Sequence, residues 1–536
     1  MSLATNYANW WRTAVIYQIY PRSFQDTTGN GIGDLEGIRR RLEHILRLGA
    51  NAIWISPFYP SPMCDFGYDV SDYKGVDPLF GLIEEFKSLL DDAHALGLRV
   101  IIDQVWSHTS DQHAWFRESR QDSSNSKANW YTWAEAKTDG SPPNNWQSVF
   151  GGSAWTWETR REQYYLHNFL TEQPDLNFHD SAVQDAILDV ARFWFDLGVD
   201  GFRLDVCNFY FQDRALRDNP ARADGRRGPN PHDWQSHLYC RSQPENLSFL
   251  ERLRSLADEY GATCLMGEIG DDEGQSRLIE YTSGNQRLHT AYCFDLLADR
   301  SDAAFMNETL KRWETSRDGW PTWAIGNHDV PRVATRWSLG SPTVEKTRLF
   351  AAFQMSLRGT ICVYQGEELG LGQAYVPFER LQDPEGKAFW PGKPGRDGCR
   401  TPMPWEEKAH QAGFSDGTQT WLPIASQHLQ NAVDKQECDT NSVLSLYRKL
   451  IALRQQVLPL KVGSMSTCVK DDQVLIIERE TLGSSVTCAF NLGDEGAGFR
   501  LKCRQEILLV QEGLTIDASD HMQLSPWGWA ILQNDH

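Results

Sequence analysis

The chain has 536 residues and a formal net charge of −20, from 52 Lys and Arg against 72 Asp and Glu. A chain of this length exceeds the size of one hydrophobic core, so we expect two or three domains. The excess of negative charge argues against nucleic acid or an anionic membrane as a partner and favours a small neutral ligand.

Cysteine usage and the N-terminal sequence bear on location. The 11 cysteines are dispersed without a C-x-x-C pair, which is typical of a reducing compartment. The start, MSLATNYANWWRTAV, lacks the basic and apolar regions of a signal peptide, and no apolar run reaches the roughly 18 residues of a membrane span. We predict a cytoplasmic monomer or small homo-oligomer that acts on a small molecule.

Strand-like and helix-like segments alternate from the N-terminus. Helices are expected at residues 37–50, 84–98, 181–197 and 443–456. Eight strands are expected at residues 15–20, 51–58, 99–106, within 197–213, and at 262–268, 290–295, 321–325 and 359–366. This order predicts an α/β protein with a parallel (β/α)8 barrel, whose chemistry belongs at the C-terminal ends of the strands.

Departures from this alternation set the predicted domain boundaries. A loop-rich stretch after the third strand is long enough for an inserted domain, and a last region alternates like β-strands. The predicted domains are a barrel made of residues 1–106 and 178–457 with an insertion at 367–439, an inserted domain at 107–177, and an all-β C-terminal domain at 458–536.

The fourth strand, within LGVDGFRLDVCNFYFQD (197–213), carries two opposite charges in an apolar sequence. With a period of two, Arg203 and Asp205 share one face of this strand. A buried strand accommodates such charges when they pair with each other or serve a function. This segment alone is compatible with a structural ion pair and with a catalytic one.

Polar residues recur where the predicted strands end. They are Asp103 and His108 after the third strand, Arg203 and Asp205 on the fourth, Glu268 after the fifth, and His328 and Asp329 after the seventh. Because the strand ends of a barrel meet at one mouth, we expect these side chains to form an active site. Three carboxylates without an obvious metal cage are typical of glycosidic bond cleavage.

The surroundings of these carboxylates predict different protonation states. Arg203 lies one pleat before Asp205 and is expected to keep Asp205 ionised. The apolar residues before Glu268 favour its protonated form, which suits a general acid. Asp329 would then bind substrate hydroxyls and favour a positively charged transition state.

These segments resemble the α-amylase family of glycoside hydrolases (family 13) over nearly the whole chain. The matching motifs are DQVWSHTSD (103–111), GFRLDVCNF (201–209), GEIG (267–270) and GNHD (326–329). Motifs that look like those of the oligo-1,6-glucosidase and α-glucosidase subgroup are CDFGYDVSDY (64–73), QPDLN (173–177) and GRDGCRTPMPW (395–405). The resemblance implies a retaining, exo-acting α-glucosidase that needs no cofactor for catalysis, with family domains B and C at residues 107–177 and 458–536.

The resemblance also implies individual roles. Asp205 matches the nucleophile that forms a β-glucosyl-enzyme, Glu268 the acid/base, and Asp329 the stabiliser of the transition state. Asp69 and Arg400 look like the pair that holds the terminal 4-hydroxyl and closes the pocket beyond one glucose. The full substrate-binding set predicted here is Tyr68, Asp69, His108, Arg203, His328 and Arg400.

A glycine-interleaved segment near the N-terminus carries oxygen-bearing side chains on alternate residues. This spacing suits a hard cation wrapped by a short loop, and it resembles the Ca²⁺ or Mg²⁺ loop of the subgroup. The predicted ligands are Asp26, Thr28, Asn30, the carbonyl of Ile32, and Asp34. A glycine-rich turn without an ion is the alternative.

Val206 bears on linkage preference. Members of the family that cleave α-1,6 bonds often carry Val directly after the nucleophile, so the resemblance favours α-1,6 bonds and leaves α-1,4 bonds open. Val330, where many oligo-1,6-glucosidases have Gln, weakens that inference. Val206 packing behind its strand, with no part in specificity, is the alternative.

Two other functions compete with hydrolysis. An α-glucosyltransferase or sucrose-active enzyme would share the covalent intermediate, although the RLDRD-like loop of the sucrose-isomerising relatives is absent. A non-catalytic barrel acting as a partner subunit belongs to another class, but such relatives have lost the active-site carboxylates. We expect hydrolysis, with glucosyl transfer as a side activity.

Overall fold

The computed structural model describes residues 9–534 except 226, 316–318, 502–504 and 512. Its largest sheet is ordered β10-β11-β1-β2-β3-β7-β8-β9, and a parallel bridge between Ala291 and Pro321 joins the two ends of the sheet. These strands are β1 (Val15–Ile19), β2 (Ala52–Ile55), β3 (Arg99–Gln104), β7 (Gly201–Leu204), β8 (Cys264–Ile269), β9 (Thr290–Cys293), β10 (Thr322–Ala324) and β11 (Thr360–Tyr364). The predicted barrel is confirmed.

Side chains alternate between the two surfaces of this sheet, as the period of a strand requires. Trp54 and Met266 belong to a core cluster inside the barrel, whereas their neighbours Ile53 and Leu265 belong to the larger cluster beneath the helices. A barrel of this size is filled by its own side chains. The polar residues on the inner surface therefore have no water around them and must be satisfied by one another.

The helices that surround the strands follow the predicted pattern with one break. They are α2 (Leu35–Arg40), α3 (Leu42–Leu48), α4 (Ile83–Ala95), α6 (Ser181–Asp196), α7 (Asn246–Glu259), α8 (Gly274–Thr282), α9 (Ala303–Thr315), α10 (Val333–Arg336), α11 (Val344–Ser356) and α14 (Val443–Gln456). The single helix expected at 37–50 is two helices that meet at Arg41, whose φ of −106° and ψ of 9° leave the helical range. None of the described helices is long and apolar enough to cross a membrane.

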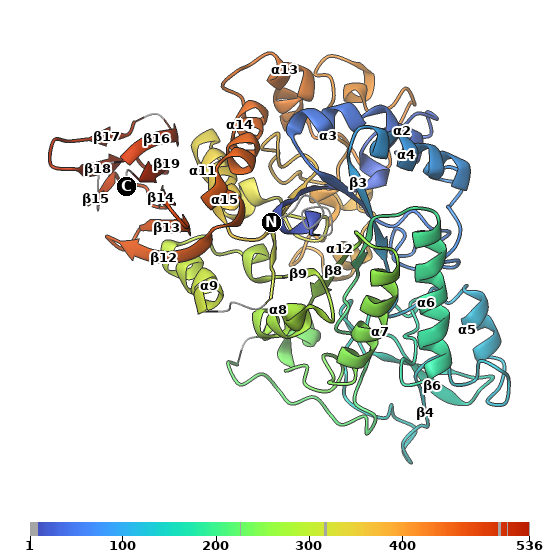
Figure 1. Ribbon diagram of the computed structural model, residues 1–536. Coiled ribbons are helices and arrows are strands. Elements are labelled where there is room, and N and C mark those ends of the chain that lie inside the picture. The colour runs from blue at the N-terminus through green and yellow to red at the C-terminus, as the bar shows by residue number, and fades with distance from the viewer. Residues whose placement is uncertain (1–8, 226, 316–318, 502–504, 512, 535–536) are drawn as a thin grey trace.

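The inserted domain after β3 holds a three-stranded sheet in the order β4-β6-β5, at the lower right of Figure 1. Its elements are α5 (Ala114–Ser119), β4 (Trp133–Ala134), β5 (Trp155–Glu158) and β6 (Gln163–Leu166). The β7–α7 segment (residues 205–245) lies against this domain. The side chain of Asn145 donates to the carbonyl of Asn219 and accepts from its amide, and the indole of Trp146 donates to the carbonyl of Arg217 at 2.9 Å.

The C-terminal domain lies at the left of Figure 1 and consists of two antiparallel sheets ordered β12-β13-β14-β19-β16 and β15-β18-β17. The strands are β12 (Ser464–Lys470), β13 (Val474–Thr481), β14 (Ser484–Asn491), β15 (Ala497–Arg500), β16 (Gln505–Val510), β17 (Thr515–Ile516), β18 (His521–Leu524) and β19 (Trp529–Asn534). The predicted all-β domain is confirmed, but a short helix, α15 (Leu458–Val462), precedes its first strand.

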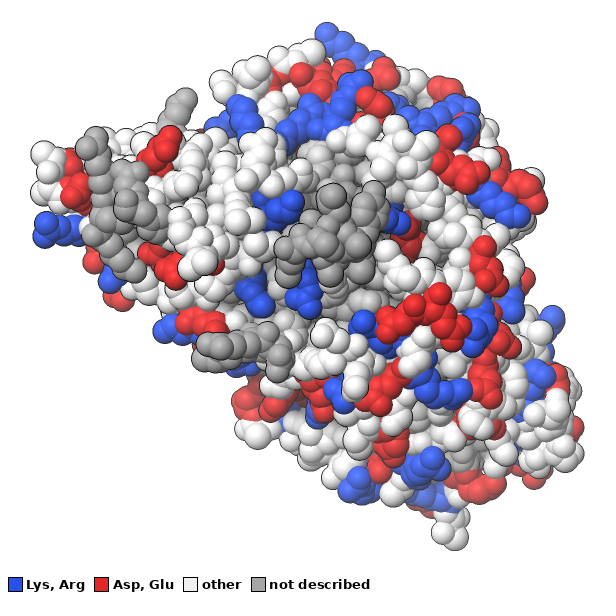
Figure 2. Space-filling view, viewed as in Figure 1, with Lys and Arg blue, Asp and Glu red and all other residues white. Residues whose placement is uncertain are grey.

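Charge on the visible surface is mixed. Figure 2 shows Lys and Arg interspersed with Asp and Glu over the described part of this face, rather than gathered in one basic surface. This face therefore presents no continuous basic surface to a polyanion in its described part.

Candidate active site

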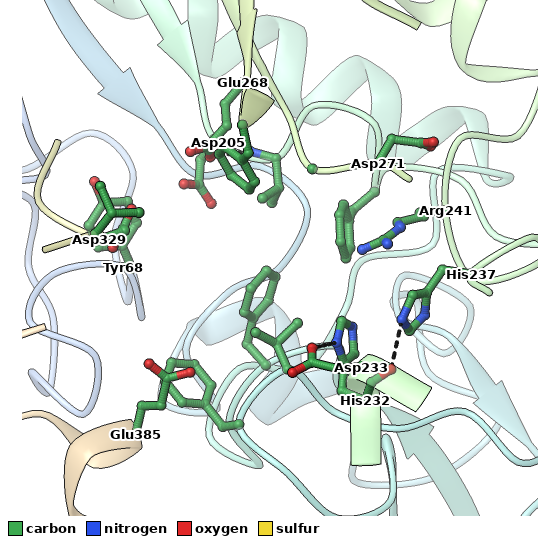
Figure 3. Close-up of a pocket in the computed structure, with 18 of the residues that line it drawn as sticks. Tyr68, Asp205, His232, Asp233, His237, Arg241, Glu268, Asp271, Asp329 and Glu385 are labelled. Atoms are coloured by element: carbon green, nitrogen blue, oxygen red, sulfur yellow. Dashed lines mark hydrogen bonds and ion pairs between the residues drawn. The ribbon is translucent and has the colours of Figure 1, made fainter. Parts of the chain in front are cut away.

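A cavity of about 520 Å³ opens at the C-terminal ends of the barrel strands, within the range of small-molecule sites. The strand ends form its floor, while the inserted domain, the β7–α7 segment and residues 385–396 form its walls. Figure 3 shows Asp205 and Glu268 together on one side of it, with Tyr68 and Asp329 facing them. The structure therefore brings the three predicted catalytic carboxylates to one cavity.

Arg203 lies beneath the cavity and holds its carboxylates in place. Its Nη1 donates to Asp205 Oδ1 at 2.6 Å and to Asp103 Oδ1 at 2.8 Å, and its Nη2 lies 2.6 Å from Glu268 Oε2. Arg203 is fully buried and is not among the lining residues, so its predicted place in the substrate-binding set is wrong. It positions the residues that face the substrate, because only its planar fork reaches several carboxylates at once.

The turn after β7 is strained. Val206 has a φ of +33°, which a β-branched residue rarely adopts, and its amide donates to Glu268 Oε2 at 3.1 Å. Val206 lines the cavity beside Asp205, which favours a contact with the substrate over packing behind the strand alone. Backbone strain held in this way is characteristic of functional sites, where the surrounding contacts fix one conformation.

The pKa values of the two carboxyls next to Arg203 move in the same direction. Burial raises the pKa of Asp205 to about 7 and that of Glu268 to about 7, while Arg203 opposes both shifts. The predicted contrast, with Asp205 readily ionised and Glu268 held neutral, does not arise in the substrate-free site. Because the guanidinium of Arg203 contacts both carboxyl groups, Asp205 and Glu268 titrate as a coupled pair, and neither pKa belongs to one residue alone.

Tyr292, at the end of β9, is a further contact of this cluster that the sequence did not single out. Its hydroxyl donates to Glu268 Oε1 at 2.9 Å and accepts from Arg203 Nη2 at 2.8 Å. Both oxygens of Glu268 are thereby oriented. The sequence could have predicted this contact only from the alternation of the sixth barrel strand, which places the side chain of Tyr292 on the inner face of the barrel.

Tyr68 lines the wall opposite Asp205 and Glu268, and His328, which is fully buried and does not line the cavity, packs against it. Their rings are stacked with centroids 5.2 Å apart, and Tyr68 Oη lies 2.5 Å from His328 Nε2. Gln18 Nε2 donates to His328 Nδ1 at 2.8 Å, so the proton of the neutral ring lies on Nε2. Burial lowers the pKa of His328 to about 3, which makes it neutral at pH 7.

Asp329 is the ionised carboxylate of the site. It lies 2.9 Å from Arg400 Nη2 and 3.4 Å from Arg396 Nη1. Burial alone would raise the pKa of Asp329, but His328, Arg400 and Arg396 together hold it well below its usual range. Because His328 is itself neutral, we ascribe this effect chiefly to the two arginines.

The predicted pair of Asp69 and Arg400 does not form. Asp69 is fully buried outside the cavity and accepts hydrogen bonds from Ser61 Oγ and from the backbone amides of Cys64 and Asp65. The carboxylate that lines the cavity is instead that of Asp65, and Arg396 Nη2 binds it at 2.7 Å. The prediction selected the wrong aspartate of CDFGYD. The sequence does not show which of the two carboxylates accepts the backbone hydrogen bonds of the turn and is thereby kept out of the cavity.

His108 lines the cavity as predicted and is held from three sides. Its Nδ1 lies 2.8 Å from Ser107 Oγ, and its Nε2 lies 2.9 Å from the Tyr68 carbonyl and 3.1 Å from Gln173 Nε2. Burial lowers the pKa of His108 to about 4, so this ring is also neutral at pH 7. Gln173, in the QPDLN motif, thereby orients a cavity residue from the inserted domain.

The remaining wall consists of residues that the sequence analysis missed. Most come from the β7–α7 segment, which has no periodic pattern to predict its course. They are Phe209, Arg222, His232, Asp233, His237 and Arg241, together with Phe150 and Phe169 of the inserted domain and Phe294 after β9. The concentration of aromatic and charged residues in a long loop was the only available signal.

The sequence comparison agrees with this geometry. A family model described as the α-amylase catalytic domain matches residues 18–463. The chain belongs to the α-amylase family. That match runs from within β1 to the end of α15 and includes the inserted domain.

Several relatives in this family match nearly the full chain. A protein of Rhizobium meliloti (strain 1021) named probable α-glucosidase is 51% identical over 531 residues, covering 97% of this chain and 96% of the relative. An oligo-1,6-glucosidase of Heyndrickxia coagulans is 35% identical, covering 91% and 93%. A crystal structure of an α-glucosyl transfer enzyme, XgtA, has a TM-score of 0.95 at 52% identity, covering 98% of this chain and 99% of that one.

In the loop predicted to bind a cation, the carboxylates of Asp26 and Asp34 accept hydrogen bonds from other groups of the protein. Asp26 Oδ1 accepts from Thr28 N, Thr28 Oγ1 and Gly29 N, and its Oδ2 accepts from Gly31 N and Ser415 Oγ. Asp34 caps α2 and also accepts from the backbone and hydroxyl of Thr27.

Each oxygen of Asp26 accepts at least two hydrogen bonds, which fills the two lone pairs of a carboxylate oxygen. The two oxygens of Asp34 share three donors, which are the amide and the single hydroxyl proton of Thr27 and the amide of Gly37. The side chain of Asn30 accepts from the amide of Ile32. The side chains of Asp26, Asn30 and Asp34 thus form hydrogen bonds within the protein, and the metal site at Asp26, Thr28, Asn30, Ile32 and Asp34 stays a prediction from sequence.

Proposed function

We propose that this protein is a retaining, exo-acting α-glucosidase that releases terminal α-linked glucose from short α-glucosides. The observation that carries the proposal is the sharing of Arg203 by Asp205 and Glu268 at the floor of the cavity. Retaining glycosidases need two carboxyl groups only about 5–5.5 Å apart, and one guanidinium that binds both favours such a spacing.

The first step is attack by Asp205 on the anomeric carbon. An Asp205 oxygen bonds to C1 of glucose while the bond from C1 to the leaving oxygen breaks, and Glu268 gives its proton to that oxygen. The raised pKa of Glu268 makes a proton available near pH 7. Asp329 stays ionised and favours the positive charge that develops on the sugar ring.

The second step releases the sugar. Glu268, now a carboxylate, takes a proton from water, the water oxygen bonds to C1, and the bond from C1 to Asp205 breaks. A sugar or alcohol can take the place of this water, so the same intermediate partitions between hydrolysis and transfer. The aromatic wall formed by Phe150, Phe169 and Phe209, together with the likeness to a glucosyl transfer enzyme, favours transfer as a substantial second activity.

Exo-action is part of the proposal and is supported by the ion pairs at the end of the cavity near Asp65 and Asp329. Arg396 binds Asp65, Asp329 and Asp383, and Arg400 also binds Asp329. Such a network suits the terminal hydroxyls of one glucose.

Linkage preference is assigned to Val206. Its side chain faces the cavity next to Asp205, where the second residue of the substrate must pass. Its size and position support a preference for α-1,6 bonds over α-1,4 bonds. We also propose cytoplasmic action as a monomer or small homo-oligomer, which is supported by the free state of every cysteine in the described part of the chain.

The proposed mechanism is tested with a fluorinated, mechanism-based α-glucosyl fluoride followed by peptide mass spectrometry. We expect one label on Asp205, no label in Asp205→Asn, and release of glucose first as the α-anomer. A label on another residue, or initial release of the β-anomer, would contradict the proposal. A substrate panel of maltose, isomaltose and sucrose then ranks linkages, with and without an added alcohol acceptor.

A further inference from the structure

The acceptor side of the cavity combines an aromatic surface with fixed charges. Phe169 and Phe209 lie with ring centroids 5.7 Å apart, and Phe294 is 44% exposed beside them. Exposed aromatic side chains on the wall of a small-molecule site provide an apolar contact for a flat ligand. On the proposed function, this is the side that receives the leaving group or the acceptor.

Most charges on this side have a partner within the protein. Arg222 Nη1 lies 2.9 Å from Asp272 Oδ1, and Lys393 Nζ lies 2.5 Å from Glu385 Oε1. The carboxylate of Asp271 accepts hydrogen bonds from the hydroxyl of Ser242 and the amide of Glu273. These groups have little capacity left for a ligand.

Arg241 is the exception. It is only 8% exposed, and its guanidinium makes no hydrogen bond or ion pair with any residue that the structure describes. Its Nε is fully buried without an acceptor, and its Cζ lies 5.2 Å from the centroid of Phe209. In Figure 3 the guanidinium points from the wall into the cavity.

The neighbours of Arg241 do not supply the missing negative charge. His232 and His237 stack with centroids 4.0 Å apart, and His237 Nε2 is directed to the carbonyl of His232. Burial, Arg241 and His232 lower the pKa of His237 to about 2, so it is neutral at pH 7. Asp233 is already engaged by His232 Nδ1.

An almost fully buried, unpaired guanidinium is costly, and an anion that reaches it recovers that cost. We propose that the acceptor side of this site binds a flat aromatic aglycone or acceptor that carries a carboxylate, with the ring on Phe209 and Phe294 and the carboxylate on Arg241. This inference rests on the proposed function and names the class of leaving group or acceptor that it prefers. The planar guanidinium suits a carboxylate because two parallel N–H groups bind its two oxygens.

The chemical step is the one already described. A phenolic acceptor gives its proton to Glu268 as its oxygen bonds to C1, and the bond from C1 to Asp205 breaks. The carboxylate of the acceptor takes no part in this exchange and only positions the ring.

The test compares 4-carboxyphenyl α-glucoside with its neutral counterpart of the same size, 4-carbamoylphenyl α-glucoside. The ratio of their kcat/KM values is measured in the wild type, Arg241→Gln and Arg241→Lys. The two glucosides differ in leaving-group reactivity, but this difference is the same in every variant. It cancels when the ratio of kcat/KM values in the wild type is divided by the ratio in the variant. We expect the preference for the carboxylate to fall about tenfold or more in Arg241→Gln and by less in Arg241→Lys, and to weaken with added salt in the wild type.

Arg217→Gln is the matched control. Arg217 belongs to the same β7–α7 segment, is exposed, pairs with Asp213, and does not line the cavity, so its removal changes the net charge equally and should leave the ratio unchanged. An equal ratio in wild type and Arg241→Gln, or an equal fall in Arg217→Gln, would overturn the inference. Cleavage of 4-nitrophenyl α-glucoside by the wild type is measured alongside. If it is absent, the proposed function fails; if it is present and the ratio does not depend on Arg241, only this inference fails.

Discussion

The donor end and the acceptor side of the cavity compensate charge differently. At the donor end, Asp65 and Asp329 are both bound by Arg396, so the charges are paired before any substrate arrives. On the acceptor side, Arg241 has no partner among the described residues and packs on Phe209. The donor end is therefore preorganised for one neutral sugar, whereas the acceptor side is completed by its ligand.

The difference also follows the source of the residues. The catalytic pair is built on barrel strand ends, and at the donor end Asp65, in the connection between β2 and α4, and Arg396, after β11, are fixed by the ion pair between them. The acceptor side is built on the β7–α7 segment, which is held by contacts with the inserted domain. Substitutions near the strand ends should thus affect every substrate, and substitutions on the acceptor side should change the choice among substrates.

Asp205→Asn should have the largest effect. It removes the nucleophile at nearly constant shape, and we expect kcat/KM to fall by roughly 10⁴-fold or more for every α-glucoside, whatever its leaving group. Steady-state kinetics with maltose, isomaltose and 4-nitrophenyl α-glucoside measures the fall. Normal turnover in the folded variant would show that the strand end is not the catalytic element.

Glu268→Gln should distinguish leaving groups and change the pH profile. In the wild type, kcat/KM should fall on both sides of about pH 7, below it as the Asp205–Glu268 pair gains a second proton and above it as the pair loses its last one. Without the acid, maltose cleavage should fall about 10²- to 10⁴-fold, an activated nitrophenyl glucoside should lose much less, and the alkaline limb should disappear.

Glu367→Gln is the control for this pH profile. Burial raises the pKa of Glu367 to about 8, but this residue does not line the cavity. Its replacement should leave both limbs in place. Loss of the alkaline limb in Glu367→Gln would assign that limb to the wrong carboxyl group.

Substitution of the two aspartates of CDFGYD tests whether Asp65, and not Asp69, is the carboxylate of the donor end. Asp65→Asn breaks the pair with Arg396 inside the cavity, and we expect kcat/KM to fall about 100-fold for all substrates. Asp69→Asn should instead reduce the free energy of unfolding by about 1–3 kcal/mol through its buried turn, with a much smaller change in kcat/KM. Urea unfolding combined with kinetics separates the two, and the opposite pattern would restore the original prediction for Asp69.

Val206→Thr tests the boundary between the donor end and the acceptor side of the cavity. This residue lies beside the nucleophile and faces the acceptor side, so we expect the ratio of isomaltose to maltose cleavage to fall by about tenfold or less. Hydrolysis of 4-nitrophenyl α-glucoside reports the shared donor steps. An unchanged ratio would mean that linkage preference is decided elsewhere.

The smallest effect is expected from metal removal. Because the carboxylates of Asp26 and Asp34 already accept hydrogen bonds from the protein, chelation should leave the melting temperature within about 1 °C of its starting value. Calorimetry with Ca²⁺ and Mg²⁺ added back is the measurement. A clear rise in melting temperature would show that the loop rearranges around an ion, as the sequence motif suggested.

The sequence by itself determined the order of strands and helices and the carboxylates at the strand ends. These features are local, since a period of two or of 3.6 residues and the residue that ends a strand can be read within a short window. Asp205, Glu268, Asp329, Tyr68 and His108 were all found in this way, or by resemblance to motifs of the same length.

Only the tertiary structure decided how those groups pair. Arg396 and Asp65 are 331 positions apart in the chain, and Arg203 binds Asp103 across 100 positions, so no local pattern predicts either contact. The raised pKa values of Asp205 and Glu268 and the unpaired charge of Arg241 follow from burial, which depends on the whole fold. Long-range packing therefore sets protonation and ligand choice, because both depend on which groups share a water-free space.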